Sequence, residues 1–358
     1  MDAVALSVIV SVRNSASTLR DSLAAIRASL VPFSYELIVV DDASEDDSVP
    51  IAARYADTVV RLSGRMAGQG YARNRGVELA RGGIVAFVDA DVALKPDTLA
   101  KMVAILNSRP DVAAVSGSHT ERCAQTNFVS QYFNLLVRFG EEAYSGRCAQ
   151  FASGCGAVRR EAFLGAGMYD EWRFPVSCME SIELGARLLH AGYEVILDDQ
   201  LTATDLKRRN LLTMSREIWN RGRILARSLG YGRISTAAPS DIVFTLSRRL
   251  PPAIAVGGTL MLAAAFVPQP HFLTKTALGV GVLLLTSLPV HRYYAGSRGL
   301  AFSILAAPLH IFAQLVTGVA LCTGWVLRDL FGDHSPDAVT QAYSEVGLEI
   351  WPPIPRKR

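Results

Sequence analysis

The chain has 358 residues, a formal net charge of +3 and a hydrophobic content of 50%, and only 19% of its residues are charged. Soluble proteins average about 25% charged residues, and intrinsic disorder requires low hydrophobicity with high net charge, so disorder is excluded for most of the chain. The near-neutral charge gives no support for a nucleic-acid partner. Five cysteines without a CxxC pair argue against a disulfide scaffold and favour a reducing compartment.

Apolar runs alternate with helical patterns through the first ninety residues. The runs are rich in β-branched residues, which is typical of buried parallel strands, and the segments between them have helical spacing. This alternation predicts an α/β fold with a parallel sheet and right-handed crossovers. The expected strands are residues 6–12, 36–40, 58–62 and 84–88, and the expected helices are residues 17–29, 46–55 and 72–81.

The next hundred residues are less regular. Their expected strands are residues 112–116, 154–158 and 194–197, and their expected helices are residues 96–107, 127–143, 159–164 and 182–191. Residues 206–229 mix basic and apolar side chains, which predicts a helix on a membrane surface. The alternative for this segment is an ordinary solvated basic face.

The apolar residues are concentrated near the end of the chain. Between residues 250 and 327 the charged side chains are Lys275, Arg292 and Arg298 alone. Because about 20 helical residues cross the hydrocarbon layer, three segments are candidate spans, with the buried core of a soluble helical domain as the alternative. They are residues 250–267, 272–290 and 299–327.

The flanks of these segments predict an orientation. Arg248 and Arg249, and the basic residues between the second and third segments, mark the cytoplasmic side by the positive-inside rule. The first 30 residues lack the apolar core of a signal peptide. We therefore expect a multi-pass protein of the inner cell membrane.

Acidic residues follow two of the predicted strands directly. Ligands on parallel sheets bind beyond the carboxyl ends of the strands. Asp89 and Asp91, one residue apart after residues 84–88, are suited to a divalent cation with room for a diphosphate, although a solvated turn is the alternative. Asp41 and Asp42 are suited to accept hydrogen bonds from a base or a ribose.

The glycines near residue 70 do not form a dinucleotide fingerprint. Gly64, Gly68 and Gly70 make no GxGxxG and follow the third strand rather than the first, and no GxxxxGK[ST] phosphate loop is present in the sequence. A nicotinamide-dependent enzyme is therefore disfavoured.

Six motifs, in this order, resemble the family 2 glycosyltransferases of GT-A fold over about residues 5–230. They are SVIVSVRN at 7–14, ELIVVDDAS at 36–44, GYARNRG at 70–76, FVDAD at 87–91, GCGAVRREAFLGAGMYDE at 154–171 and MESIELGARL at 179–188. The resemblance implies a Rossmann-like, mostly parallel sheet followed by C-terminal transmembrane helices. It also implies transfer from a nucleotide-diphosphate sugar with inversion at the anomeric carbon.

The resemblance implies roles on the nucleotide side. Asp41 would hold a uracil-type base, with Val12 and Asn14 lining the nucleotide pocket. Asp42 belongs to the same group, or else caps a helix or forms an ion pair. Arg73 would contact the base or the diphosphate, with a surface helix arginine as the alternative.

The same resemblance makes Asp89 and Asp91 the aspartates that bind the sugar diphosphate and Mg²⁺ or Mn²⁺. Where many relatives carry a histidine that completes the metal site, this chain has Asp205, which is also a hard oxygen ligand.

The general base expected from the family is altered. Relatives use the Asp of a Glu-Asp pair, which here reads Glu180-Ser181. Glu180 is therefore the first candidate base and Glu183 the second, unless Glu180 is structural.

Three basic residues are candidates for binding a phosphate or anionic lipid headgroups: Lys207, Arg208 and Arg221.

These observations predict a membrane-attached, metal-dependent inverting glycosyltransferase. It would transfer a sugar, most simply from a UDP-sugar, to a lipid-linked or cell-envelope glycan acceptor on the cytoplasmic side. A polyprenyl-phosphate glycosyltransferase and a catalytically impaired membrane scaffold or nucleotide-binding subunit are the alternatives. The expected parts are a catalytic domain at 1–205, interfacial helices at 206–248, a membrane region at 249–330 and a tail at 331–358.

Overall fold

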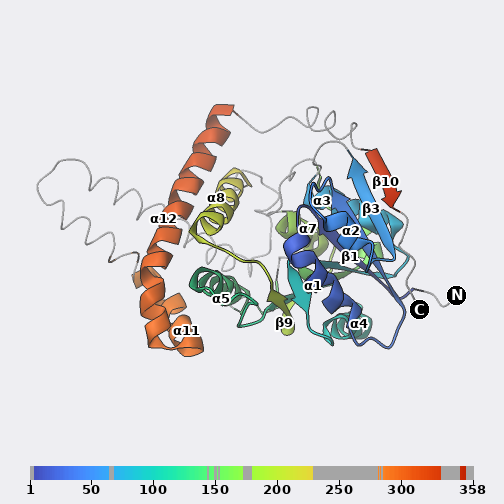
Figure 1. Ribbon diagram of the computed structural model, residues 1–358, viewed down its shortest axis with the longest axis horizontal. Coiled ribbons are helices and arrows are strands. Elements are labelled where there is room, and N and C mark those ends of the chain that lie inside the picture. The colour runs from blue at the N-terminus through green and yellow to red at the C-terminus, as the bar shows by residue number, and fades with distance from the viewer. Residues whose placement is uncertain are drawn as a thin grey trace, which may run out of the picture. The chain divides into compact units, whose positions relative to one another are not determined.

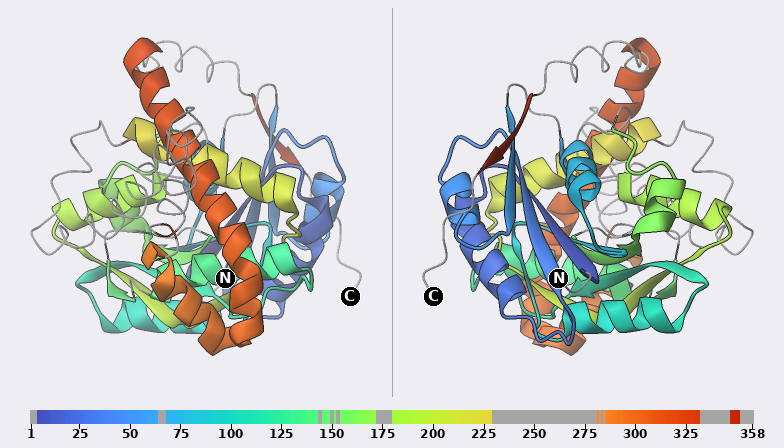
Figure 2. Two further views of the ribbon diagram at one scale, coloured as in Figure 1. Left: turned by 90° about the vertical axis from the view of Figure 1, so that its left-hand side faces the viewer. Right: turned by 90° about the vertical axis from the view of Figure 1, so that its right-hand side faces the viewer.

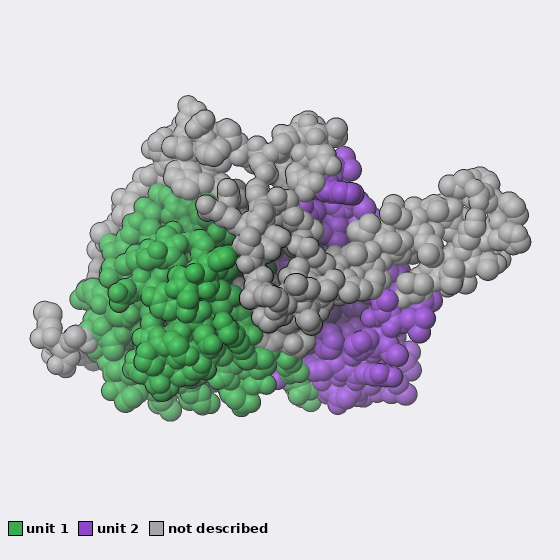
Figure 3. Space-filling model, turned by 180° about the vertical axis from the view of Figure 1, so that it is seen from behind, with its two compact units in different colours: residues 1–126, 140–208, 334–358 green, residues 127–139, 209–333 purple. Residues whose placement is uncertain are grey.

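The computed structural model describes residues 4–63, 68–142, 145–148, 151, 154–171, 180–228, 281, 283, 285–331 and 347–351. The chain divides into two compact units (Figure 3). Unit 1 consists of Met1–Thr126, Gly140–Arg208 and His334–Arg358, and unit 2 consists of Asn127–Phe139 and Arg209–Asp333.

Unit 1 is built on a sheet that has ten strands within the described residues, in the order β10-β3-β2-β1-β4-β8-β6-β9-β5, with β7 paired to β9 (Figure 1). The strands are β1 Leu6–Val12, β2 Tyr35–Asp42, β3 Thr58–Ser63, β4 Ile84–Val88, β5 Val92–Leu94, β6 Val112–His119, β7 Gly146–Arg147, β8 Cys155–Arg159, β9 Glu194–Asp205 and β10 Gly347–Trp351. The four strands β3, β2, β1 and β4 are parallel neighbours, as predicted from the first ninety residues.

Helices cover both faces of this sheet. Alternate residues of β1 enter different clusters, because side chains of a strand point to opposite faces. Val8 packs with Leu23 of α1 and Leu99 of α4, whereas Ile9 packs with Val77 of α3 and with α7. The helices are α1 Ala16–Arg27, α2 Ser48–Ala52, α3 Gln69–Leu79, α4 Thr98–Ser108, α6 Arg160–Gly165 and α7 Glu180–His190. Two covered faces explain why every residue of β1 is buried.

Three differences from the predicted elements concern the site. β9 extends to Asp205, eight residues beyond the predicted end, and pairs with β5, a strand that the sequence did not indicate. The helix predicted from residue 206 begins at Leu211. The predicted tail contributes β10, which runs antiparallel to β3 at the sheet edge (Figure 2).

Unit 2 is helical in its described part. It contains the beginning of α5 Phe128–Glu142, together with α8 Leu211–Ser228, α11 Leu288–Arg298 and α12 Leu300–Phe331 (Figure 1). Its core includes Tyr132, Met214 and Tyr294. A Cβ on Gly222 of α8 would lie 2.8 Å from the Ala320 Cβ of α12, so these two helices approach closely at small residues, a packing common between membrane helices.

One helix, over Leu300–Leu327, is long and apolar enough to cross a membrane by length and composition. It coincides with the third predicted segment. Segment 250–267 and most of segment 272–290 lie outside the described residues. The basic residues between the second and third predicted segments lie on α11; they are His291, Arg292 and Arg298.

Candidate functional site

The carboxyl ends of three parallel strands bring predicted site residues to one edge of the sheet. Val12 ends β1 and pairs in register with Asp41 of β2, and Asp89 follows the end of β4. The Val12 side chain is buried. The apolar strands thus carry the polar groups that follow them to one place, as the prediction from strand ends requires.

Asp41 is a buried carboxylate with spare hydrogen-bonding capacity. Its Oδ2 accepts the Ser44 N–H at 3.2 Å and lies 3.7 Å from Arg61 Nε. Within the described part of the chain, Oδ1 has no hydrogen-bond partner. Burial raises the pKa of Asp41 above its ordinary value. A buried acceptor in this state is suited to a ligand N–H donor.

Asp42 and Asn14 shape the loop around Asp41. Asp42 is buried, and its Oδ2 accepts the Gly68 N–H at 2.9 Å. This hydrogen bond fixes the residue that precedes α3. Asn14 has a φ of 46°, a left-handed conformation that Asn tolerates, and its Oδ1 accepts the Glu45 N–H at 2.8 Å. Asn14 therefore joins the end of β1 to the loop after β2.

Asp89 is held through one oxygen. Its Oδ1 accepts Arg73 Nη2 at 2.7 Å and Gln69 Nε2 at 2.8 Å, both from α3. A Cβ added to Gly154 would lie only 2.9 Å from Asp89 Oδ2, so a side chain at position 154 would displace the carboxylate. The Asp89 side chain is 32% exposed. The glycine therefore leaves room for the Asp89 Oδ2 atom.

Arg73 lies inside the protein and contacts two carboxylates. Its side chain is 3% exposed, and Nη1 lies 3.4 Å from Glu180 Oε1 in addition to the contact with Asp89. The guanidinium also lies over the Tyr169 ring, 5.7 Å from its centroid. The alternative of a surface helix arginine is wrong. Although burial opposes the charge, Asp89 and Glu180 outweigh it and raise the pKa of Arg73.

Neither candidate base is open to solvent. Glu180 begins α7 with 1% exposure and pairs with Arg73. Glu183, 5% exposed, receives both Arg187 Nε at 2.8 Å and Arg187 Nη2 at 2.6 Å. In the structure both carboxylates are paired with arginines, and their role as the general base stays a prediction.

Asn74, which is not among the predicted site residues, fixes the segment at Tyr169 and Glu171 beside Arg73. Its Nδ2 donates to the Tyr169 carbonyl at 2.9 Å and to Glu171 Oε1 at 2.7 Å, and its Oδ1 accepts the Tyr169 N–H at 3.1 Å. Arg75 also donates to Glu171. In the Ala-Arg-Asn-Arg sequence, residue type indicates a role for Arg73 alone. No local pattern indicates that Asn74 contacts Tyr169, which is 95 residues away.

Asp91 and Asp205 are neighbours through the main chain. The Leu206 N–H donates to the Asp91 carbonyl at 2.8 Å, and Asp205 pairs in register with Val92. Asp205 Oδ1 accepts the Lys207 N–H at 2.8 Å. Among the described residues no group of three or more His, Cys, Asp or Glu side chains is gathered for a metal. The three predicted ligands therefore share one sheet edge without forming a closed cluster.

The basic residues predicted to bind phosphate are divided between the two units. Lys207 and Arg208 belong to unit 1, with Arg208 exposed, and Arg221 belongs to unit 2, where it lies over the Phe133 ring. Arg209, which the sequence reasoning passed over, is buried in unit 2 and donates to Glu217 Oε2 at 3.1 Å.

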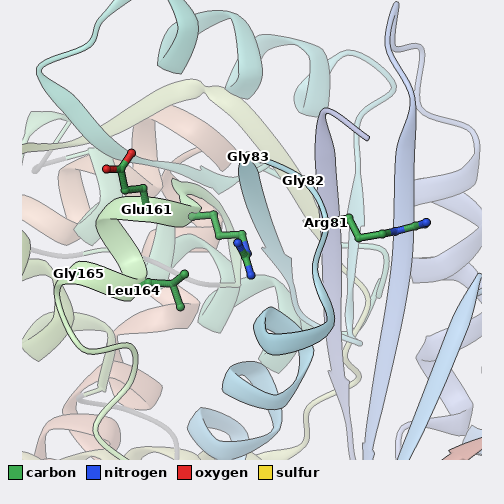
Figure 4. A pocket seen from close by; sticks show the side chains of 7 residues that line it. Arg81, Gly82, Gly83, Glu161, Leu164 and Gly165 are labelled. Atoms are coloured by element: carbon green, nitrogen blue, oxygen red, sulfur yellow. The ribbon is translucent and has the colours of Figure 1, made fainter. Parts of the chain in front are cut away.

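A shallow cavity of about 570 Å³ lies near the opposite end of β4 (Figure 4). It is lined by Arg81, Gly82, Gly83, Arg160, Glu161, Leu164 and Gly165. Because Arg81–Gly83 precede β4 and Asp89 follows it, the cavity is separate from the acidic edge, and it contains none of the predicted site residues.

Comparison with known proteins relates the chain to one enzyme family. Residues 7–165 match the family described as Glycosyl transferase family 2. An uncharacterized glycosyltransferase of Mycobacterium bovis is 32% identical over 182 residues, which is 49% of this chain and 77% of that protein. The glucosyl-dolichyl phosphate glucuronosyltransferase of Haloferax volcanii is 27% identical over 143 residues, which is 38% of this chain and 46% of that protein.

A solved structure shares the fold. It is the mannosyltransferase of Pyrobaculum calidifontis in complex with GDP-Man and Mn²⁺, which superimposes with a TM-score of 0.58 at 20% identity, covering 90% of this chain and 86% of that one. Some curated relatives are much longer than the matched region, since the chain spans about half of the H. volcanii enzyme and a third of a Bacillus subtilis relative. The chain has the GT-A fold and belongs to glycosyltransferase family 2.

Proposed function

We propose that this glycosyltransferase moves a sugar from a nucleotide-diphosphate sugar, with UDP as the nucleotide, to a lipid-linked or cell-envelope glycan acceptor, with inversion at the anomeric carbon. The observation that carries this proposal is that two carboxylates, Asp41 and Asp89, lie at one edge of the sheet. Asp41 is buried and its Oδ1 has no hydrogen-bond partner among the described residues, and Asp89 Oδ2 faces the space beside Gly154. The first is suited to a base N–H and the second to a diphosphate with its cation.

The donor side is supported by charge and hydrogen bonding. The open Oδ1 of Asp41 is an acceptor for the imide N–H of uracil. Val12 lies beside Asp41 at the end of β1, and Asn14 and Asp42 hold the adjoining loops through Glu45 and Gly68. Arg73 is buried, so it would affect diphosphate binding through its ion pair with Asp89.

The oxygen ligands fit a hard divalent cation, Mg²⁺ or Mn²⁺. Asp89 and half-buried Asp91 supply carboxylate oxygens, and the absence of a Cβ at Gly154 leaves room beside Asp89 Oδ2. Asp205 would join them once its side chain turns from the Lys207 amide. Such a cation would offset charge that grows on the leaving diphosphate.

Membrane attachment is supported by α12 and α8. The Leu300–Leu327 helix is long enough to cross the hydrocarbon layer, and its outward apolar side chains include Leu300, Ile304 and Phe312. α8 adds the basic side chains of Arg216 and Arg221. We therefore place the acceptor in or at a membrane, with Lys207, Arg208 and Arg221 as candidates for anionic headgroups. The proposed compartment is the cytoplasmic side of the inner membrane.

Calorimetric titration with UDP and Mn²⁺ tests the donor site. We expect binding to the wild-type chain and its loss in Asp89→Ala/Asp91→Ala. The matched control is Asp97→Ala/Asp111→Ala, which removes two carboxylates that are 54% and 55% exposed at the ends of α4 and β6, and which keeps wild-type affinity. Equal affinity in all three proteins would refute the site.

A second assay separates the enzyme from the impaired scaffold, which is favoured by the burial of Glu180 beside Ser181. The chain is incubated with UDP-glucose, UDP-N-acetylglucosamine or GDP-mannose and native membranes, and nucleotide release is measured. Release that depends on Asp89 supports the transferase. Tight UDP binding without release from any donor supports the scaffold.

A further inference from the structure

A histidine–glutamate pair lies at the acidic edge and belongs to none of the groups above. His119 ends β6, and its Nδ1 lies 2.7 Å from Glu141 Oε1, while its backbone N–H donates to Glu141 Oε2 at 2.8 Å. A carboxylate accepts hydrogen bonds, so Nδ1 carries the proton and Nε2 is the basic nitrogen of the ring. One carboxylate thus fixes both the tautomer and the orientation of the imidazole.

The sheet register places this pair on the same edge as Asp89. β8 lies between β4 and β6, the Asp89 N–H donates to the Gly154 carbonyl at 3.0 Å, and Ser116 of β6 pairs with Gly156 of β8. His119 itself pairs with Ala203, two residues before Asp205. His119 is therefore near the ends of the strands that carry Asp89 and Asp205.

Cys155, between the two acidic groups, gives a second indication of this proximity. Burial raises the pKa of the Cys155 thiol to about 12, and the negative charges of Glu141 and Asp89 both add to the shift. A Cβ on Gly117 would lie 2.9 Å from the Cys155 sulfur, just as one on Gly154 would lie 2.9 Å from Asp89 Oδ2. The edge between Asp89 and the pair is therefore lined by small residues.

Exposure distinguishes the pair from the predicted bases. The side chains of His119 and Glu141 are 28% and 15% exposed, whereas those of Glu180 and Glu183 are 2% and 6% exposed and each contacts an arginine. A group that accepts a proton from an incoming acceptor must be reachable from solvent. His119 meets this requirement and has an oriented basic nitrogen.

Resting on the function proposed above, we propose that His119, oriented by Glu141, accepts the proton of an acceptor hydroxyl. The O–H proton passes to His119 Nε2, an oxygen lone pair forms the new bond to the anomeric carbon, and the bond to the nucleotide diphosphate breaks with its electron pair on the leaving phosphate oxygen. Glu141 stabilises the imidazolium. The acceptor class is a hydroxyl, because a polyprenyl phosphate brings an oxygen that is already ionised.

The test uses the full chain in detergent and the donor with the fastest nucleotide release among UDP-glucose, UDP-N-acetylglucosamine and GDP-mannose. The acceptor probes are water and octyl glucoside, which have hydroxyls, and undecaprenyl phosphate. His119→Gln should lose about 10²–10⁴-fold in kcat with the hydroxyl acceptors and keep its affinity for UDP. Glu141→Gln should lose less than His119→Gln, and Glu180→Gln should keep more activity than either. His190→Gln, on an exposed histidine of α7, is the matched control.

Imidazole rescue tells a chemical role from a structural one. Added imidazole should restore His119→Ala by about tenfold or more and leave Asp89→Asn unchanged. The proposal is overturned if His119→Gln keeps hydroxyl transfer within about threefold of wild type, if imidazole restores nothing, or if the wild-type chain uses undecaprenyl phosphate alone. Failure of the underlying function differs, since wild type itself would then neither bind UDP with Mn²⁺ nor release nucleotide.

Discussion

Replacing Arg73 by methionine should destabilise unit 1 strongly, because it removes a buried charge that two carboxylates share. The Glu180 side chain is 2% exposed, so without Arg73 it keeps an uncompensated charge, which costs about 3–5 kcal/mol. The Asp89 side chain is 32% exposed, so its lost contact adds only about 0–1 kcal/mol. For a unit of this size the melting temperature should fall by roughly 6–24 °C.

Thermal melting of four proteins tests this reasoning: wild type, Arg73→Met, Glu180→Gln and the double variant. Since the double variant no longer has the buried unpaired charge, it should recover about 2–3 kcal/mol relative to Arg73→Met. Arg109→Met, at a 45% exposed arginine whose partners Asp111 and Glu194 are 55% and 27% exposed, should cost less than about 1 kcal/mol. Additive losses in the double variant, or an Arg73→Met melting temperature equal to that of Arg109→Met, would refute a buried charge network.

Three further outcomes are expected. Gly154→Ala should push Asp89 aside and weaken UDP–Mn²⁺ binding at least about tenfold in calorimetry, and unchanged affinity would contradict the assigned contact. Burial raises the pKa of Asp41, so the folded chain binds its proton more readily than the unfolded chain and stability falls as pH rises above about 4. Asp41→Asn should therefore melt higher than wild type at pH 7, lose this advantage below about pH 4 and bind UDP poorly; a lower melting temperature at pH 7 would contradict this. Gly324→Ala, whose Cβ would lie 2.5 Å from a carbonyl of α8, should cost about 1–3 kcal/mol, whereas Gly296→Ala, with open space, should cost nothing; equal melting temperatures would argue against the close helix contact.

The sequence predicts those parts of the fold that local patterns encode. The strands at 6–12 and 84–88 are continuous apolar runs because helices cover both faces of the sheet. The second half of β9 was missed because Asp198, Asp199 and Gln200 interrupt its apolar pattern. β10 was missed because it exists through pairing with β3, nearly 300 residues away in the chain, and such long-range pairing leaves no local signal.

The site shows the same division. Asp41 and Asp89 were predicted because strand ends are recognisable and parallel strands end at one edge. The partners of Arg73 and His119 were not, since the Arg73–Glu180 contact spans 107 residues and the His119–Glu141 contact joins a strand to the end of a helix. Residue type suggested chemistry at Arg73 and Glu180 but did not single out His119, and only the packing reveals which of these charges are buried and paired.

A single turn of α3 contacts three separate parts of the site. Arg73 reaches Asp89 and Glu180, while Asn74 and Arg75 hold Glu171. A ligand that draws Asp89 away from Arg73 therefore changes the ion pair between Arg73 and Glu180. By linkage, a ligand that moves Glu180 changes the ion pair between Arg73 and Asp89 by the same coupling free energy. The states of Asp89 and Glu180 are consequently linked through Arg73, and we expect a substitution at Arg73 to affect both carboxylates together.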